Sequence, residues 1–362
     1  MRAFACPVCR SLVFFHNSVC VTCKTALGFD RPTGEILALT PTDAGLRTTG
    51  DGPARRPCAN IRLAACNWLA PVDGPLLCSS CLLTRTRPAD ADLRGLASFL
   101  RAEVAKRQLL FQLDELRLPV VGRADDPEHG LAFDLLGRHA GPVITGHDDG
   151  LITIDLAEGE DGYREALRVR LAEPYRTLLG HFRHEVGHWY WDVLISASPL
   201  LPECRALFGD ERVDYAEALK RHYDSEPLPG WQQQHVSVYA TAHPWEDWAE
   251  TFAHYLHLRD TLQTASAFGI WVGGPDVPVR TSPKAPLSAL PDDNVEDFDA
   301  IITTWLPLTL ALNAVNRSMG KDDLYPFVLS PGVQDKLRFV DTVVRSAQAA
   351  ASVSTGPSWE ST

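Results

Sequence analysis

The cysteines of this 362-residue chain are concentrated near its N-terminus. Eight of the nine precede position 82, and Cys204 lies in the remainder. Closely spaced cysteines in a chain that is not secreted are typical of metal sites, whereas disulfides persist in oxidising compartments. A small module that cannot bury enough apolar surface is stabilised by such a metal. We therefore expect the first 87 residues to fold around bound metal ions.

The first cysteine cluster consists of two CxxC motifs, Cys6-Pro-Val-Cys9 and Cys20-Val-Thr-Cys23. Each motif forms a tight turn that directs two thiolates to one point, and four sulfurs complete the closed tetrahedral shell of a structural zinc. The pattern predicts a zinc ribbon over residues 1–35.

The second cysteine cluster (Cys58, Cys66, Cys78 and Cys81) contains a single CxxC motif. We expect these four thiolates to hold a second structural zinc in a module over residues 36–87. Neither cluster leaves an open coordination position, so no catalysis is expected there. Docking of a partner protein or shielding is the predicted role of this head.

Charge and hydropathy limit the possible partners. Residues 1–87 contain ten Lys and Arg against five Asp and Glu, while the whole chain has a net charge of −12. A mildly basic head without a basic run does not favour nucleic acid as a partner. The N-terminal MRAFACPVCR lacks the apolar segment of a secretory signal, and no apolar run reaches the roughly 18 residues of a membrane span. We expect a cytoplasmic protein without a membrane partner.

The stretch HFRHEVGHWYWD (181–192) contains the HExxH pattern in His184, Glu185 and His188. Histidines four apart on a helix present their imidazoles on one face, where both can bind one metal ion. Glu185 borders that face and can reach a water on the metal without binding the metal itself. The same five letters also occur by chance on polar helix faces, so a third ligand must be found.

The residues after His188 exclude the metzincin arrangement, because Trp189, Tyr190 and Trp191 replace its glycine and histidine. A later helix that begins at Pro244 offers Glu246 and Glu250, four apart on one face. The pair fits a metal ligand and a carboxylate that fixes the tautomer of a histidine ligand. Two alternatives remain: acidic residues are common in any first helical turn, and Glu211 is a rival ligand.

Together, HFRHEVGHWYWD, LFGDERVDYAEAL, SVYATAHPWEDWAETFAHYLH and the CPVC…CVTC head resemble the zinc-binding metallopeptidase family with an N-terminal zinc ribbon. The resemblance extends from the first CxxC to about residue 269 and implies a gluzincin-like zincin of bacterial, cytosolic type. It implies no particular substrate. By similarity to other gluzincins, Glu246 is the third ligand and Glu250 supports a histidine. Tyr239, seven residues before Glu246, is expected to stabilise the oxyanion, with His235 as a weaker candidate.

Two further polar residues near the motif have open roles. Asp192, four residues after His188, is a candidate to orient that imidazole. His181 shares the ligand face and is either an alternative ligand or a hydrogen-bonded residue outside the site.

Hydrophobic periodicity completes the predicted organisation. Helices are expected over 93–116 (capped by Asp90 or Asp92), from Glu173-Pro174 to about 195, and from Pro244, and strands over 12–15, 131–136 and 151–156. Thr40–Pro57 is predicted to be a loop and Thr84–Asp90 a linker. The expected fold class is α+β: zinc-ribbon modules, then a mainly α-helical zincin-like metallopeptidase domain with a small β-sheet over 88–345, and a disordered tail over 346–362.

The expected function is zinc-dependent hydrolysis of peptide bonds by a metallopeptidase with one catalytic and two structural zinc ions. Glu185 would take a proton from the attacking water and deliver it to the leaving amine. The expected partner is a peptide or protein substrate. Two alternatives stay open: a zinc-ribbon interaction or regulatory protein with a non-catalytic zincin scaffold, and an amidase that acts on non-peptide amides.

Overall fold

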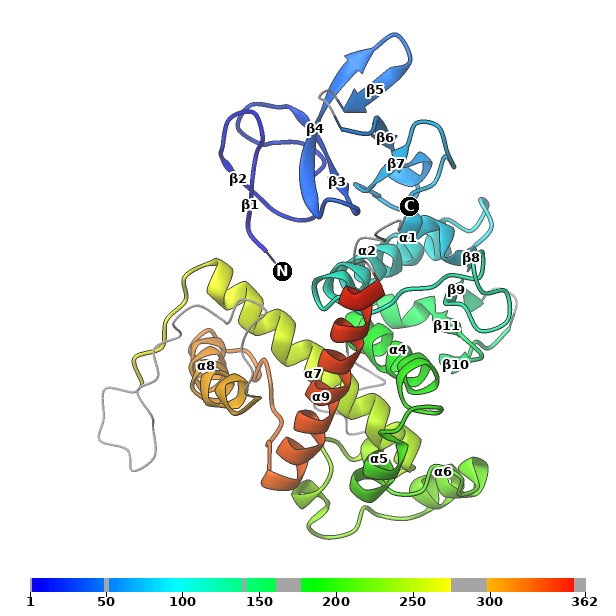
Figure 1. The fold of residues 1–362 in the computed structure, drawn as a ribbon, viewed down its shortest axis with the longest axis vertical. Coiled ribbons are helices and arrows are strands. Elements are labelled where there is room, and N and C mark those ends of the chain that lie inside the picture. Colours follow the sequence, from blue (N-terminus) through cyan, green and yellow to red (C-terminus); the bar gives the residue numbers. More distant parts are fainter. Residues whose placement is uncertain (1, 49–51, 139–140, 161–176, 275–297, 355–362) are drawn as a thin grey trace, which may run out of the picture. The chain divides into compact units, whose positions relative to one another are not determined.

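The computed structural model describes residues 2–48, 52–138, 141–160, 177–274 and 298–354 (Figure 1). The chain divides into two compact units, which are described separately. The described residues of unit 1 lie within 2–112, 120–160 and 177–182, and those of unit 2 lie within 113–119 and 183–354.

The N-terminal part of unit 1 consists of short antiparallel strands around the cysteines. They are β1 (Phe4–Ala5), β2 (Leu12–Val13), β3 (Ala26–Asp30), β4 (Glu35–Thr42), β5 (Gly45–Thr48), β6 (Arg55–Pro57) and β7 (Leu69–Pro71), with the short helices η1 (Ala59–Ile61) and α1 (Ser79–Leu82). Buried aromatic rings of Phe15, Phe29, Trp68 and Phe111 pack against one another in this part, with centroid separations of 4.7–6.3 Å. Burial of these aromatic rings therefore stabilises this part of unit 1 in addition to the cysteine clusters.

The predicted loop over Thr40–Pro57 is wrong in part. Strand β4 runs to Thr42 and forms a hairpin with β5, in which Thr42 pairs with Gly45. Gly45 has φ +91°, a left-handed conformation that suits glycine in a tight turn. The Gly, Pro and Asp residues of this segment indicated a loop. They instead connect two strands that contain β-branched threonine, which favours strands.

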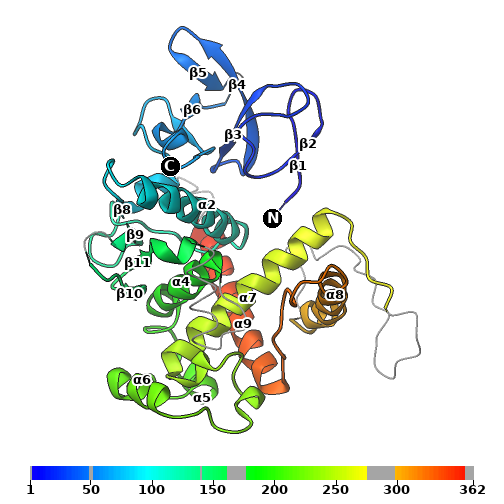
Figure 2. The same cartoon turned by 180° about the vertical axis from the view of Figure 1, so that it is seen from behind.

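The four-stranded sheet of unit 1 has the strand order β10-β11-β9-β8 (Figure 2). Its strands are β8 (Thr84–Thr86), β9 (Ala132–Leu136), β10 (Gly146–Asp148) and β11 (Leu151–Asp155), and η3 (Leu156–Gly159) follows. The strands predicted over 131–136 and 151–156 are confirmed as β9 and β11. The predicted linker is wrong over β8, which pairs in parallel with β9 and whose Arg85 forms an ion pair with Asp134.

The helix predicted over 93–116 is confirmed as α2 (Leu93–Glu115). Of the two candidate caps, Asp92 accepts a hydrogen bond from Gly95 N at 2.8 Å. This contact satisfies one of the backbone donors left without a partner at the start of a helix.

Unit 2 is mainly helical. Its helices are α4 (Leu178–Leu194, from residue 183 onward), α5 (Leu201–Phe208), α6 (Tyr215–Asp224), α7 (Pro244–Ala267), α8 (Phe298–Ser318) and α9 (Pro331–Ser354), with η4 (Trp231–Gln233) and η5 (Tyr239–Thr241). Helix α7 packs against α5, α8 and α9, and Figure 1 shows α9 lying across it. The rings of Phe208, Phe252 and Phe339 surround Trp248 at the centre. Short strands around cysteines and a helical unit confirm the α+β prediction.

The helix predicted from Pro244 is confirmed as α7, and α4 contains the HExxH residues as predicted. The predicted start of α4 at Glu173-Pro174 lies outside the described residues. The predicted tail is wrong from 346 to 354, because α9 continues to Ser354. Alanine, which favours helix, is frequent there, and Gln348 Nε2 donates to Leu116 O at 2.9 Å.

Among the described residues, α8 alone has the length and hydropathy of a membrane span, with a mean hydropathy of 1.4 over its best window. Of that window, 39% is buried within the protein. Pro307 lies inside the same helix. The helix is weak evidence for a membrane, and the cytoplasmic location stays a prediction.

Helices α4 and α7 meet closely at Gly187, the glycine of the HExxH stretch. A Cβ atom at Gly187 would lie 3.1 Å from Ala249 Cα, 3.2 Å from Ala249 O and 3.3 Å from Phe252 Cβ. Trp248 Nε1 donates a hydrogen bond to Gly187 O at 2.8 Å. The missing side chain lets the backbones approach, and this approach places the first turn of α7 beside the two histidines of α4.

We predict that Gly187→Ala destabilises the protein. Alanine normally stabilises a helix interior relative to glycine by about 1 kcal/mol. Here its methyl group would press on backbone atoms of α7, and overpacking costs roughly 1–3 kcal/mol. Thermal unfolding should show a lower midpoint in the variant, and a higher midpoint would contradict the close approach.

Candidate metal centre

Three donor atoms from two helices converge in unit 2. His184 and His188 on α4 place their Nε2 atoms 3.1 Å apart. Glu246 Oε2, from the first turn of α7, lies 3.0 Å from His184 Nε2 and 3.3 Å from His188 Nε2. We refer to these three atoms as the donor triangle. The structure thus brings together the two histidines of the motif and the predicted third ligand.

The donor triangle fits a zinc ion. Bonds of 2.0–2.1 Å at tetrahedral angles put neighbouring N and O ligand atoms about 3.3 Å apart, close to the observed separations. Glu246 is 1% exposed, and among the described residues its Oε2 has no hydrogen-bond partner. A buried carboxylate oxygen without a donor is costly unless something positive binds it. Two neutral imidazoles and one carboxylate are also the donor set of many catalytic zinc sites.

Glu250 holds the imidazole of His184 from behind. His184 Nδ1 lies 2.8 Å from Glu250 Oε1, and Ser237 Oγ donates to Glu250 Oε2 at 2.5 Å. Burial raises the pKa of Glu250, but the hydrogen bond and charge of His184, the charge of His254 and the hydrogen bond from Ser237 together lower it more, to about 2. An ionised carboxylate can only accept, so Nδ1 is the donor. In the neutral imidazole that a metal would bind, the lone pair is then on His184 Nε2, which faces the other two atoms of the donor triangle.

Glu246 is held at its other oxygen by a tyrosine. Tyr215 on α6 donates its hydroxyl to Glu246 Oε1 at 2.5 Å. Burial raises the pKa of Glu246, while the adjacent imidazoles of His184 and His188 together lower it more, so the net pKa is below the usual range. The carboxylate is ionised at neutral pH, as a ligand must be. Tyr215 and Ser237 were not singled out from the sequence.

The remaining predicted groups of the site are Glu185, Tyr239 and His235. Glu185 is 6% exposed and adjacent to His184 on α4. The ring of Tyr239, in η5, lies 5.9 Å from the ring of His184. Burial, then the charge of Glu246, raise the pKa of Tyr239, so its hydroxyl remains a donor. His235 differs, because its Nε2 lies 3.6 Å from Asp247 Oδ2. Burial, followed by the charge of Lys336, lowers the pKa of His235 to about 4.

The alternatives considered for the third ligand have other partners. Arg205 Nε donates to Glu211 Oε2 at 2.9 Å, and the pair is bidentate. His181 Nε2, in unit 1, lies 3.0 Å from Glu158 Oε2. Asp192 is exposed, whereas His188 is 3% exposed. That Asp192 orients the imidazole of His188 stays a prediction.

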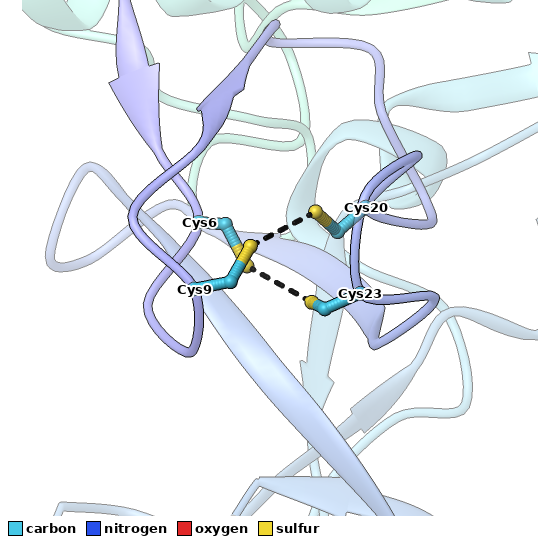
Figure 3. Close-up of side chains that lie close together, drawn as sticks. All are labelled: Cys6, Cys9, Cys20 and Cys23. Atoms are coloured by element: carbon cyan, nitrogen blue, oxygen red, sulfur yellow. Dashed lines mark hydrogen bonds between the residues drawn. The ribbon is translucent and has the colours of Figure 1, made fainter.

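The first cysteine cluster is assembled as predicted. Figure 3 shows the four sulfur atoms facing one another from two turns, with Cys6 and Cys23 Sγ 3.7 Å apart and Cys9 and Cys20 Sγ 3.6 Å apart. Zinc–sulfur bonds of 2.3 Å at tetrahedral angles require about 3.8 Å between sulfurs. The separations fit a zinc ion with four thiolate ligands.

The second cysteine cluster has the same geometry. Cys66 Sγ lies 3.5 Å from Cys78 Sγ and 3.8 Å from Cys81 Sγ, and the ligand atoms of all four lie within 4.8 Å of one another. The structure records these cysteines as free thiols, without a disulfide. The seven-residue spacing between Cys58 and Cys66 is therefore compatible with one four-thiolate site.

A buried ion cluster on α2 lies beside the second cysteine cluster. Glu103, Lys106 and Arg107 are each at most 1% exposed. Lys106 Nζ donates to Glu103 Oε1 at 2.6 Å, Arg107 Nη2 donates to Ala64 O at 2.9 Å, and Cys81 Sγ lies 3.9 Å from Glu103 Oε2. The three side chains carry one net positive charge, which opposes the negative charge of four thiolates.

Comparison with known proteins identifies the family of this chain. Residues 95–343 match the family model described as "Putative zinc-binding metallo-peptidase", and residues 3–92 match a zinc-ribbon domain model. The chain belongs to this family of zinc-binding metallopeptidases. The resemblance drawn from the sequence is thereby confirmed, as is the zinc-ribbon region.

Relatives within this metallopeptidase family cover nearly the whole chain. "Uncharacterized protein Mb2598c" of Mycobacterium bovis and "Uncharacterized protein Rv2568c" of Mycobacterium tuberculosis are each 52% identical over 349 residues, which is 95% of this chain and 95% of each relative. No solved structure matches the chain. Family membership and the cysteine clusters together support zinc binding.

We predict that Glu246→Ala lowers zinc occupancy at the donor triangle, whereas Glu211→Ala does not. Alanine at 246 removes one of three donors, while Glu211 pairs with Arg205. The measurement is zinc content after dialysis, compared with the unsubstituted protein. Retained zinc in Glu246→Ala together with loss in Glu211→Ala would overturn the choice of third donor.

Proposed function

We propose that this chain is a zinc-dependent metallopeptidase of gluzincin type that hydrolyses peptide bonds. The observation that supports it best is the donor triangle, with a buried carboxylate oxygen that lacks a hydrogen-bond donor. Glu185 lies next to this triangle on the same helix. A ligand set of His184, His188 and Glu246 would leave one position of a tetrahedral ion for water or substrate.

Zinc, when bound, lowers the pKa of a water to about 7 and also polarises the carbonyl group of the substrate. Glu185 would accept a proton from the attacking water at its carboxylate. Glu185 then delivers the proton to the leaving amine, which balances the reaction: one water is consumed and one peptide bond is broken. The buried position of Glu185 keeps its carboxylate from being screened by bulk water.

Two other side chains support the reaction. Tyr239 would donate its hydroxyl to the carbonyl oxygen as negative charge develops there, and His235, which faces Asp247, is less suited to this role. Glu250 keeps the Nε2 lone pair of His184 directed at the metal by accepting its Nδ1 proton. Both assignments belong to the proposal.

The substrate is proposed to be a peptide or protein, and a non-peptide amide would use the same groups. In the non-catalytic alternative, a scaffold or regulator would have no use for a proton acceptor at Glu185. Docking of a partner on the zinc-ribbon head stays a prediction. Partner docking can be tested at three exposed apolar residues beside the first cysteine cluster, Val8, Phe14 and Val21.

We predict three zinc ions per chain: one in each cysteine cluster and one at the donor triangle. Elemental analysis should give about three for the unsubstituted protein and about two for Cys78→Ser, since a closed site needs its four ligands. Cys204→Ala, which changes the cysteine outside both clusters, is the matched control and should keep three. Unchanged stoichiometry in Cys78→Ser would remove the second cysteine site.

We predict that Glu185→Gln leaves the protein folded and metal-loaded but hydrolytically inactive. Glutamine has nearly the same shape but cannot accept the proton, a loss worth about 10²–10⁴-fold in rate. Peptide-library cleavage and zinc content should be measured together, with the exposed Glu203→Gln as control. Equal cleavage rates at equal zinc content would exclude the proposed mechanism, as would an unsubstituted protein inert to every peptide and amide.

A further inference from the structure

A tyrosine from a separate helix contacts the carboxylate of the donor triangle. Tyr215 is the first residue of α6, whose start is capped by Asp214 through a hydrogen bond from Glu217 N at 2.8 Å. Its hydroxyl donates to Glu246 Oε1 at 2.5 Å, while Glu246 Oε2 faces the two histidines. The two oxygens of Glu246 thus have different surroundings: one has a hydrogen-bond donor and the other has none.

A buried histidine fixes Tyr215 in this position. His243 is the N-cap of α7, and its Nδ1 accepts a hydrogen bond from Trp245 N at 3.1 Å. The proton of a neutral ring is then on Nε2, which donates to Val213 O at 3.1 Å, two residues before Tyr215. The His243 ring also packs edge-on against the Tyr215 ring, with centroids 5.2 Å apart. One imidazole thereby attaches the start of α6 to the start of α7.

Burial of the ring does not account for the tyrosine. Tyr215 is 39% exposed, and its ring contacts with His243 and Trp245 would be equally available to phenylalanine. The hydroxyl is the part of the side chain that has a specific partner. A hydrogen bond to an ionised carboxylate is typically short and strong, and the separation here is 2.5 Å.

We propose that Tyr215 is a positioning residue for the metal: its hydroxyl holds Oε1 of Glu246 and leaves Oε2 alone for zinc. A carboxylate that is free to rotate can bind with either oxygen or with both, and ordering it costs affinity. The contact with Tyr215 fixes one orientation before the metal arrives. This inference rests on the proposed zinc site and goes beyond it in assigning α6 a part in metal affinity.

The test is the variant Tyr215→Phe, with Tyr223→Phe as its matched control. Tyr223 lies on the same helix and is 63% exposed. Zinc is titrated into protein whose donor triangle was emptied with a chelator, after elemental analysis shows that both cysteine clusters remain loaded. Thermal unfolding of the metal-depleted forms is measured alongside, because a purely structural role would change it.

We expect zinc to bind Tyr215→Phe about 10–100-fold more weakly than the unsubstituted protein, as is typical when a partner of a ligand is lost. Tyr223→Phe should bind as the unsubstituted protein does, and the unfolding midpoint without this zinc should not change. Equal zinc affinity in Tyr215→Phe and the unsubstituted protein would overturn the role of Tyr215 while leaving the zinc site intact. An unsubstituted protein that takes up no zinc beyond the cysteine clusters would overturn the proposed function as well.

Discussion

Helices α4 and α7 approach each other at the one position of the HExxH stretch that has no side chain. Gly187 lies between Glu185 and His188, and its carbonyl accepts the indole N–H of Trp248. Trp248 is two residues after Glu246, so the contact that joins the helices also sets how far along α4 the carboxylate lies. Because a Cβ atom would already be in tight contact with α7 backbone, the separations within the donor triangle depend on this glycine.

The electrostatics of the site follow from burying several carboxylates together. Glu250 is compensated by His184 and Ser237, and its neighbour Asp247 by Lys336, whose Nζ donates to it at 2.5 Å. Glu246 differs, because Tyr215 satisfies one oxygen and the other faces only imidazole nitrogens. Buried charges are tolerated when they are paired. A divalent cation would complete the pairing of Glu246, which links the stability of this helical unit to its metal content.

Much of the site could be read from local sequence. Spacing alone places His184 and His188 on one face, and the E-x-x-x-E spacing marks Glu246 and Glu250, because both patterns follow from the period of a helix. Tyr215 and His243 could not be found in this way. Their contacts depend on how α6 packs against α7, and no spacing within either segment encodes that.

The fold was predictable to a similar extent and for similar reasons. Long periodic segments such as α2 and α7 were assigned correctly, as were the β-branched strands β9 and β11. Errors arose where tertiary pairing overrides local composition: β5 lies within a stretch of turn residues, β8 within an expected linker, and α9 continues through Ala- and Ser-rich residues that indicated disorder. A strand of three or four residues has little signal of its own until its partner strand is known.

We propose that two histidines of α4 and one glutamate of α7 hold a single zinc ion. Anomalous diffraction at the zinc absorption edge from crystals of the metal-loaded protein tests it most directly. The account predicts a peak about 2.0–2.2 Å from His184 Nε2, His188 Nε2 and Glu246 Oε2, separate from the peaks at the cysteine clusters. Peaks at the cysteine clusters alone, or a peak coordinated by Glu211 in place of Glu246, would contradict it.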